Sequence, residues 1–152
     1  MLMEIKKLRE DAIKPFYQTE GSVAFDVSAV EEYIIEPDST RSKFLISPVT
    51  MVHTGLAIAI PEGYEVNVRA RSGLSLKYPN YIAISGGGTV DFDYRGEIII
   101  PIINNTDKIW LIERGDRIAQ CVVSPILRVE FMFVDELSET KRADGGFGHT
   151  GR

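Results

Sequence analysis

Two short segments of the sequence hold residue types suited to binding and hydrolysing a phosphate ester. The first is Arg-Ala-Arg-Ser-Gly at 69–73, which follows an alternating run of apolar and polar residues. Arg71, Ser72 and Gly73 offer a guanidinium fork, a hydroxyl and a closely approaching backbone N–H, the parts of a phosphate cradle. A motif this short is more often an ordinary turn, so it needs support from the rest of the chain.

The second segment combines close backbone approach with two acids in Gly-Gly-Gly-Thr-Val-Asp-Phe-Asp-Tyr-Arg-Gly at 86–96. Glycines between β-type runs let a ligand or a second backbone come near. Asp91 and Asp93 alternate, so they share one face of an extended segment, where two carboxylates repel unless a cation or a proton separates them. Both acids could simply cap a hairpin turn. The catalytic alternative makes one acid the general base for a water and places the other in a structural ion pair.

Three further features are less specific by themselves. Asp26 is a lone acid among apolar residues, for which a turn or cap is the expected role. Arg-Gly-Asp-Arg-Ile-Ala-Gln at 114–120 reads as a turn leading into a strand. Residues 138–152, SETKRADGGFGHTGR, are too rich in glycine for a strand ladder, and their basic pair before Gly-Gly-Phe-Gly is typical of a phosphate-wrapping loop with one stacking ring. We expect a β domain at 1–137 and a mobile C-terminal arm at 138–152.

Short β-strands must position these segments, because period-2 patterns dominate the chain. Residues 64–71 and 128–133 alternate apolar and polar side chains, as half-buried strands do. Gly, Pro, Asn and Asp interrupt the other β-type runs at close intervals, which predicts a single-domain, all-β sandwich or barrel. A single turn or short helix is expected at 72–77. The other β-type runs are 23–27, 32–35, 43–46, 56–60, 81–84, 97–103, 109–112 and 117–123.

Composition and charge exclude several classes of protein. The chain has 152 residues, a net charge of −5 and one cysteine, which suits one globular domain without a disulfide framework. The negative charge argues against stable nucleic-acid binding. The longest apolar run, at 98–103, is far too short for a membrane helix, and the charged N-terminus does not read as a signal peptide. We expect a cytoplasmic protein, or one in the host cytosol if a virus encodes it.

Taken in order, five segments resemble the motifs of the homotrimeric dUTP pyrophosphatases (dUTPases). Each is unspecific alone, and the order and spacing of all five carry the resemblance. It implies a jelly-roll-like β fold, Mg²⁺-assisted hydrolysis of dUTP to dUMP and pyrophosphate, and a homotrimer whose active sites are shared between subunits. Such an enzyme would limit uracil incorporation into DNA and supply dUMP for dTMP synthesis. The segments are residues 24–29, 71–74, 88–96, 115–120 and 142–151.

The resemblance also implies roles for individual residues. Asp91 would orient and deprotonate the attacking water, Tyr94 would pack on the deoxyribose and exclude a 2′-hydroxyl, and Asp26 would support the metal indirectly, through water. Arg142 would bind the γ-phosphate and Phe147 would stack on the uracil. The full set of implied substrate contacts is Arg71, Ser72, Gly73, Ser85, Gly88, Val90, Tyr94, Gln120, Arg142, Phe147, Gly148 and Thr150.

Four residues depart from the family pattern without removing a group on which the chemistry depends. Phe25 replaces a more usual Gly-Tyr pairing before the acid of the first motif. Ser85 lies near the position where some members place an amide against the uracil edge. Ala143 stands where the arm usually has glycine, and its methyl group restricts φ. His149 replaces a frequent serine.

Two other functions remain open from the sequence. A dCTP deaminase of the same fold would need a different catalytic acid and a deaminating water site. A non-catalytic trimeric β-sandwich that binds a partner would not need an acid at 91 together with the arm. The segment from Asp91 to Tyr94 and the Gly-Gly-Phe-Gly arm favour the pyrophosphatase.

Overall fold

The computed structural model describes residues 1–37, 49–77, 81–83, 88–104 and 106–146. The regular secondary structure of this part of the chain is almost entirely β, as the alternating patterns predict. The short helix expected at 72–77 is present, and with six residues it is too short to cross a membrane. The elements are β1 (Glu4–Lys7), β2 (Phe16–Tyr17), β3 (Ala24–Ser28), β4 (Tyr33–Ile35), β5 (Val49–Ala59), β6 (Tyr64–Arg69), α1 (Ser72–Lys77), β7 (Tyr81–Ala83), β8 (Gly88–Val90), β9 (Glu97–Asn104), β10 (Trp110–Ile112) and β11 (Arg117–Pro125).

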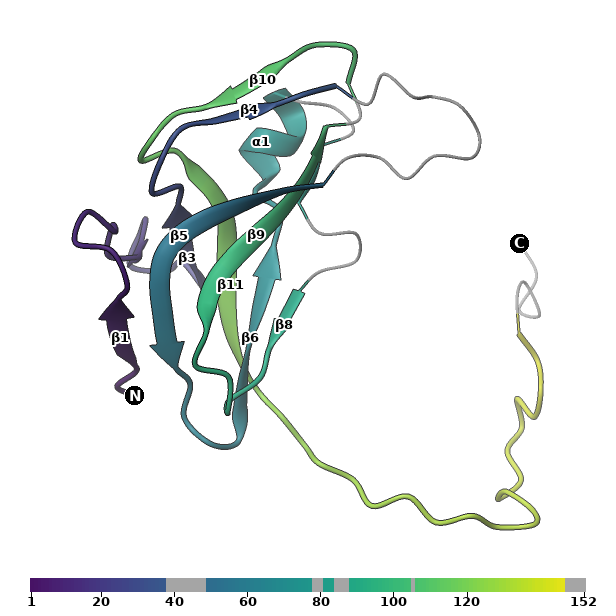
Figure 1. Ribbon diagram of the computed structural model, residues 1–152. Helices are drawn as coiled ribbons and strands as arrows, with labels where there is room; N and C mark the ends of the chain where they lie inside the picture. The colour runs from purple at the N-terminus through teal and green to yellow at the C-terminus, as the bar shows by residue number, and fades with distance from the viewer. Residues whose placement is uncertain (38–48, 78–80, 84–87, 105, 147–152) are drawn as a thin grey trace.

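Two antiparallel sheets form the two layers of the molecule (Figure 1). One has the strand order β1-β5-β9-β7 and the other has the order β2-β3-β11-β6-β8, while β4 and β10 form a separate pair. Neighbours within the sheets are mostly distant in sequence, so the strands cross from layer to layer. The predicted all-β sandwich is confirmed.

The core lies between the two layers and follows from the period-2 pattern of the strands. In β9, burial alternates strictly along the strand, and Ile98, Ile100 and Ile102 point inward. They meet residues such as Val66 and Val68 from β6 in the opposite sheet. Truncating one such buried isoleucine to alanine typically costs about 2–5 kcal/mol, so this core fixes the strands that carry the site.

One strand prediction is wrong for the chain taken alone. The alternating run at 128–133 forms no strand, and its apolar side chains are exposed, with Phe131 at 92% of its full accessible area. After Pro125 the chain leaves the sheet and runs outward as an extended segment (Figure 1). The reason lies in the topology: β11 already pairs with β3 on one edge and β6 on the other, which leaves no free edge beside it. The run expected at 43–46 lies outside the described residues.

Candidate active site

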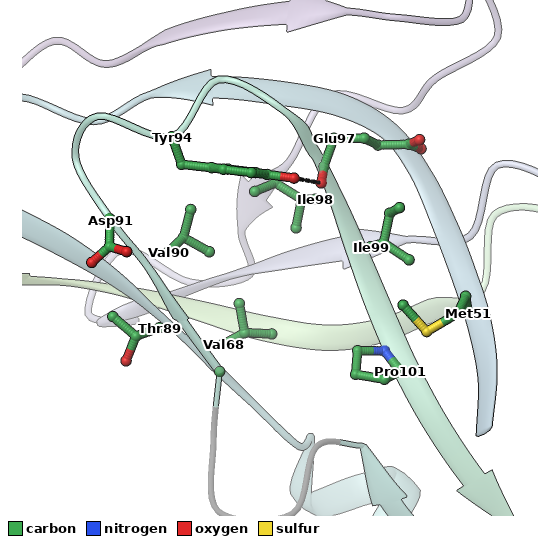
Figure 2. Close-up of a pocket in the computed structure, with 11 residues that line it drawn as sticks. Met51, Val68, Thr89, Val90, Asp91, Tyr94, Glu97, Ile98, Ile99 and Pro101 are labelled. Atoms are coloured by element: carbon green, nitrogen blue, oxygen red, sulfur yellow. Dashed lines mark hydrogen bonds between the residues drawn. The ribbon is translucent and has the colours of Figure 1, made fainter. Parts of the chain in front are cut away.

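A pocket of about 360 Å³ lies between β8 and the first half of β9 (Figure 2). Its size lies within the range of small-molecule sites, and its walls are mostly apolar, as such sites usually are. Asp91 lies at one end of the pocket, whereas Met51 and Pro101 lie at the other. The lining residues are Met51, Val68, Gly88, Thr89, Val90, Asp91, Tyr94, Glu97, Ile98, Ile99 and Pro101.

Strand pairing fixes the position of Asp91. The strand β8 pairs with β6, with Val90 opposite Val66 and Gly88 opposite Val68, and Asp91 follows directly. A turn begins at this point, closed by the Tyr94 backbone N–H, which donates to the Asp91 carbonyl at 3.1 Å. The Asp91 side chain is exposed, so a water molecule can reach its carboxylate from solvent.

Tyr94 forms a wall of the same pocket. Its hydroxyl donates to the Glu97 carbonyl at 3.1 Å, and 44% of the residue remains exposed (Figure 2). Arg95 folds back on the turn, where its guanidinium donates to the carbonyls of Phe92 and Tyr94. The sequence therefore builds a closed turn that holds one carboxylate and one ring on the same apolar pocket.

A second group of candidate residues surrounds Asp26 in the five-stranded sheet. Asp26 is only 7% exposed, and Arg71 Nε and Arg117 Nη1 donate to its two oxygens at 3.1 and 3.0 Å. The strand order β3-β11-β6 brings these residues together, because Asp26 lies in β3, Arg117 begins β11 and Arg71 follows β6. The expectation that Asp26 is a turn or cap residue is wrong, since a buried carboxylate needs such charged partners.

The phosphate-cradle candidates lie next to this ion-pair group. Arg71 also donates through Nη1 to the Arg117 carbonyl at 2.9 Å, which still leaves other guanidinium donors for an anion. Ser72 and Gly73 begin α1 and are exposed. Gln120 Nε2 donates to the Ala70 carbonyl at 2.9 Å, so it lies against the same backbone. The structure thus brings five predicted residues together here: Asp26, Arg71, Ser72, Gly73 and Gln120.

The remaining predicted residues divide between the pocket, the arm and the undescribed positions. Among the described residues, no hydrogen bond or ion pair joins the Asp91 pocket to the Asp26 group. Arg142 lies in a turn at 141–144 of the C-terminal segment, where its Nε donates to the Gly145 carbonyl at 2.8 Å. Its neighbour Ala143 has φ = +44°, the only left-handed non-glycine among the described residues. Ser85, Phe147, Gly148 and Thr150 lie outside the described residues.

Arg117 is a candidate that sequence reasoning missed. Its side chain is 38% exposed, so part of its guanidinium faces solvent while the rest holds Asp26. A signal for it existed: a lone acid in an apolar strand demands a cation. The sequence does not show which arginine supplies it, because the answer depends on which strands are neighbours.

Cys121 lies behind the ion-pair group and takes no part in acid–base chemistry. The thiol is almost fully buried, and burial, with a smaller contribution from the negative charge of Asp26, raises the pKa of Cys121 to about 12. A thiol with so high a pKa is a poor nucleophile at neutral pH.

Comparisons with known proteins agree with this geometry. The dUTPase family model matches residues 10–151. The deoxyuridine 5'-triphosphate nucleotidohydrolase of Hydrogenobaculum sp. is 46% identical over 151 residues, which are 99% of each chain. The corresponding protein of Nautilia profundicola is 41% identical over the whole of both chains.

Solved dUTPase structures share the fold. A mutant dUTPase of Staphylococcus bacteriophage 80alpha with dUpNHpp superposes with a TM-score of 0.84 at 25% identity, covering 99% of both chains. A mutant dUTPase of phage phi11 of S. aureus, described with a structural Mg(II) ion, superposes with a TM-score of 0.75 at 25% identity and covers 90% of this chain. The sandwich is therefore the jelly-roll-like β fold, and the chain belongs to the dUTPase family, the enzymes that hydrolyse dUTP.

Proposed function

We propose that this enzyme cleaves dUTP to dUMP and pyrophosphate through a water molecule activated by Asp91. One observation supports the choice of Asp91. Two acidic residues line the pocket, and the carboxylate of Glu97 is already bonded to the Gly55 N–H and the His53 ring. The described residues place no bonded partner on the Asp91 carboxylate, which is exposed and can receive a water.

The proposed step is an in-line displacement at the α-phosphorus. The Asp91 carboxylate accepts a proton from the water as its oxygen bonds to phosphorus, and the bond to the bridging oxygen of pyrophosphate breaks. General-base assistance of this kind is typically worth about 10²–10⁴ in rate. Arg71, Ser72, Gly73 and Gln120 would bind the phosphates and steady the charge that moves onto the leaving group.

The pocket walls would supply substrate selectivity. The backbone of β8 at Gly88 and Val90 would read the uracil, and a close main-chain wall rejects the extra methyl of thymine by steric clash. The ring of Tyr94 would pack on the deoxyribose and leave no space for a 2′-hydroxyl. An open apolar pocket would separate such substrates by only about 10–200-fold, so a close fit matters.

The described residues fit a Mg²⁺ ion that is held mainly by the substrate. They contain no cluster of three or more acids, histidines or cysteines that could bind a metal directly. Mg²⁺ commonly keeps several waters and binds through substrate phosphates, and it would neutralise charge on the triphosphate. Both oxygens of Asp26 already accept bonds from arginines, and the lone pairs that remain could accept a hydrogen bond from an ion-bound water.

We also propose that the enzyme is a homotrimer whose active sites combine residues of different subunits. Two observations support this. The segment after Pro125 exposes a row of apolar side chains for which the described part of the chain provides no sheet, and the chain there runs away from the two sheets (Figure 1). A neighbouring subunit would receive this segment, and the arm beyond it would bring Arg142 to the γ-phosphate and Phe147, Gly148 and Thr150 to the nucleotide. Such an enzyme would keep uracil out of DNA and supply dUMP.

Pyrophosphate release tests the substrate and the base together. Release from dUTP in the presence of Mg²⁺, with little from dCTP, dTTP or UTP, is the expected pattern. Asp91→Asn should lower kcat by about 10²–10⁴ while the affinity for a non-hydrolysable dUTP analogue stays. Asp93→Asn is the matched control, because it makes the same change two residues away. If the control lost the rate and Asp91→Asn kept it, Asp93 would be the base.

A further inference from the structure

The ring of Tyr94 lies directly on the backbone of Gly96. A Cβ atom built on Gly96 would lie 2.2 Å from the Tyr94 hydroxyl oxygen and 2.4 Å from Cζ, where real Cβ contacts are essentially never closer than 3.0 Å. Any side chain at position 96 would therefore force the ring to move by nearly an ångström or more. The ring occupies the space that a side chain would otherwise fill.

The backbone of Gly96 does not itself require glycine. Its φ lies outside the left-handed region, unlike that of Gly55 at +69° or Gly63 at +84°. Alanine could adopt the Gly96 conformation without strain if the ring were absent. The three atoms nearest to the built Cβ all belong to Tyr94, so the ring is the first obstacle to a side chain at this position.

Glu97 holds the same hydroxyl end of the ring that lies on Gly96, and Glu97 is itself held from two sides. Its carbonyl accepts the Tyr94 hydroxyl bond at 3.1 Å (Figure 2). Its carboxylate accepts the Gly55 N–H at 2.7 Å and lies 2.8 Å from His53 Nδ1. His53 and Gly55 lie where the pairing of β5 with β9 shifts register, so the carboxylate ties the start of β9 to this irregular stretch of β5.

We propose that Gly96 and Glu97 are positioning residues for sugar selectivity: together they form a seat that sets the Tyr94 ring at the height where it rejects a ribose 2′-hydroxyl. The inference rests on the role proposed above for Tyr94. Gly96 limits how far the ring can sink toward the backbone, and the Glu97 carbonyl fixes its hydroxyl end. Because a displacement of about 1 Å in a site can cost about 10²-fold, the seat should matter as much as the ring.

The test compares kcat/KM for dUTP with kcat/KM for UTP in a set of variants. Gly96→Ala should lower the dUTP/UTP ratio by about tenfold or more, because the displaced ring no longer fits the 2′ position. Tyr94→Ala should lower the ratio at least as far. Adding Gly96→Ala to Tyr94→Ala should cause no further change, because the clash has been removed. Gly21→Ala is the matched control, since a Cβ at Gly21 meets no atom within 4 Å, and it should leave the ratio unchanged.

The outcomes separate the seat from the role of Tyr94. If Tyr94→Ala loses selectivity and Gly96→Ala keeps it, the inference is overturned and the proposed function stands. If Tyr94→Ala keeps selectivity, the role of the ring fails and the inference fails with it, whereas loss of dUTP turnover in Asp91→Asn would still support the proposed chemistry. Should Gly96→Ala fail to fold, the double variant decides: rescue by Tyr94→Ala supports the seat, and no rescue overturns it.

Discussion

The turn around the pocket and the segment after Pro125 differ in whether their side chains pack against the rest of the chain. Between Gly88 and Glu97 the chain closes on itself, with the backbone of Tyr94 bonded to Asp91 and its ring seated on Gly96. After Pro125 the apolar side chains face solvent, with Leu127 at 96% and Phe131 at 92% exposure. One region packs its ring against its own backbone, and the other leaves its apolar side chains in solvent.

Strand pairing explains the difference. The strand β8 pairs with β6, and β9 lies between β5 and β7, so paired strands hold both walls of the pocket in place. The segment emerges from β11, both of whose edges are already paired. Burying one large apolar side chain is worth about 1.5–3 kcal/mol, so a row of exposed ones supports the proposal that a neighbouring subunit receives this segment.

Removal of the arm should have the largest effect, because it should lower turnover strongly while the sandwich stays folded. Truncation after Leu137 should leave the sandwich folded, because the removed residues that the structure describes are exposed or nearly so. Turnover of dUTP should fall by about 10²-fold or more, since the triphosphate is no longer held in an attack-ready position. Circular dichroism and pyrophosphate release measure the two results. A truncated enzyme with the full-length rate would mean that the arm is an ordinary frayed terminus.

Disruption of the exposed segment should weaken assembly without harming the pocket. Replacing both Phe131 and Phe133 with serine should shift the protein from trimer toward monomer in analytical ultracentrifugation. Each lost side chain removes about 1.5–3 kcal/mol of burial at the proposed interface. Val23→Ser is a suitable control, because Val23 is 77% exposed but lies outside this segment. An unchanged sedimentation profile of the double variant would exclude the segment from the interface.

Loss of one arginine beside Asp26 should lower the free energy of unfolding, an effect smaller than those predicted for the arm and for the exposed segment. Breaking a buried ion pair typically costs about 3–5 kcal/mol, and the partial exposure of Arg117 should reduce this to about 1–3 kcal/mol for Arg117→Gln. Denaturant unfolding gives the number. Adding Asp26→Asn should recover part of the loss, because the unpaired charge is removed. If Arg117→Gln were neutral, the ion pair would contribute nothing to the fold.

The smallest predicted effect concerns pH and Cys121. The pKa of this thiol is about 12 in the folded protein against 9.0 for an ordinary thiol, so the unfolded chain loses the proton first. Stability contributed by Cys121 should therefore fall as pH rises above 9, by about 1 kcal/mol between pH 8 and pH 10. The comparison of wild type with Cys121→Ala in denaturant at both pH values isolates this contribution. A stability difference that does not change with pH would show that the sheet around Cys121 opens to solvent.

Many of the strands could be predicted from the sequence, whereas the residues that pair with one another across those strands could not. Alternation predicts strands such as β6 and β9, because period-2 burial is a local property. The turn or short helix expected at 72–77 does not rest on alternation, and β2 and β8 lie outside every predicted run. The pairing of Asp26 with Arg117 joins residues 91 positions apart and depends on strand order. The same alternation at 128–133 gave the wrong result for a single chain, since a pattern shows which side chains need burial and not which surface buries them.

The seat beneath Tyr94 could not be predicted for a related reason. Gly96 reads as one more turn glycine in the sequence, and Glu97 reads as a solvated acid at the start of a strand. Only the rotamer of Tyr94 and the register shift in β5 show that one glycine makes room for a ring and that the acid ties two strands together.

Subunit mixing tests most directly the central claim that one chain supplies the Asp91 pocket and another supplies the arm. Full-length Asp91→Asn has the arm without the base, and the protein truncated after Leu137 has the base without the arm. Refolded together in equal amounts, the two should regain about a quarter of the wild-type rate, because a random trimer gives each site a one-in-two chance of each working part. A rate no higher than the sum of the two variants measured separately would contradict shared sites and place the arm on its own subunit's pocket.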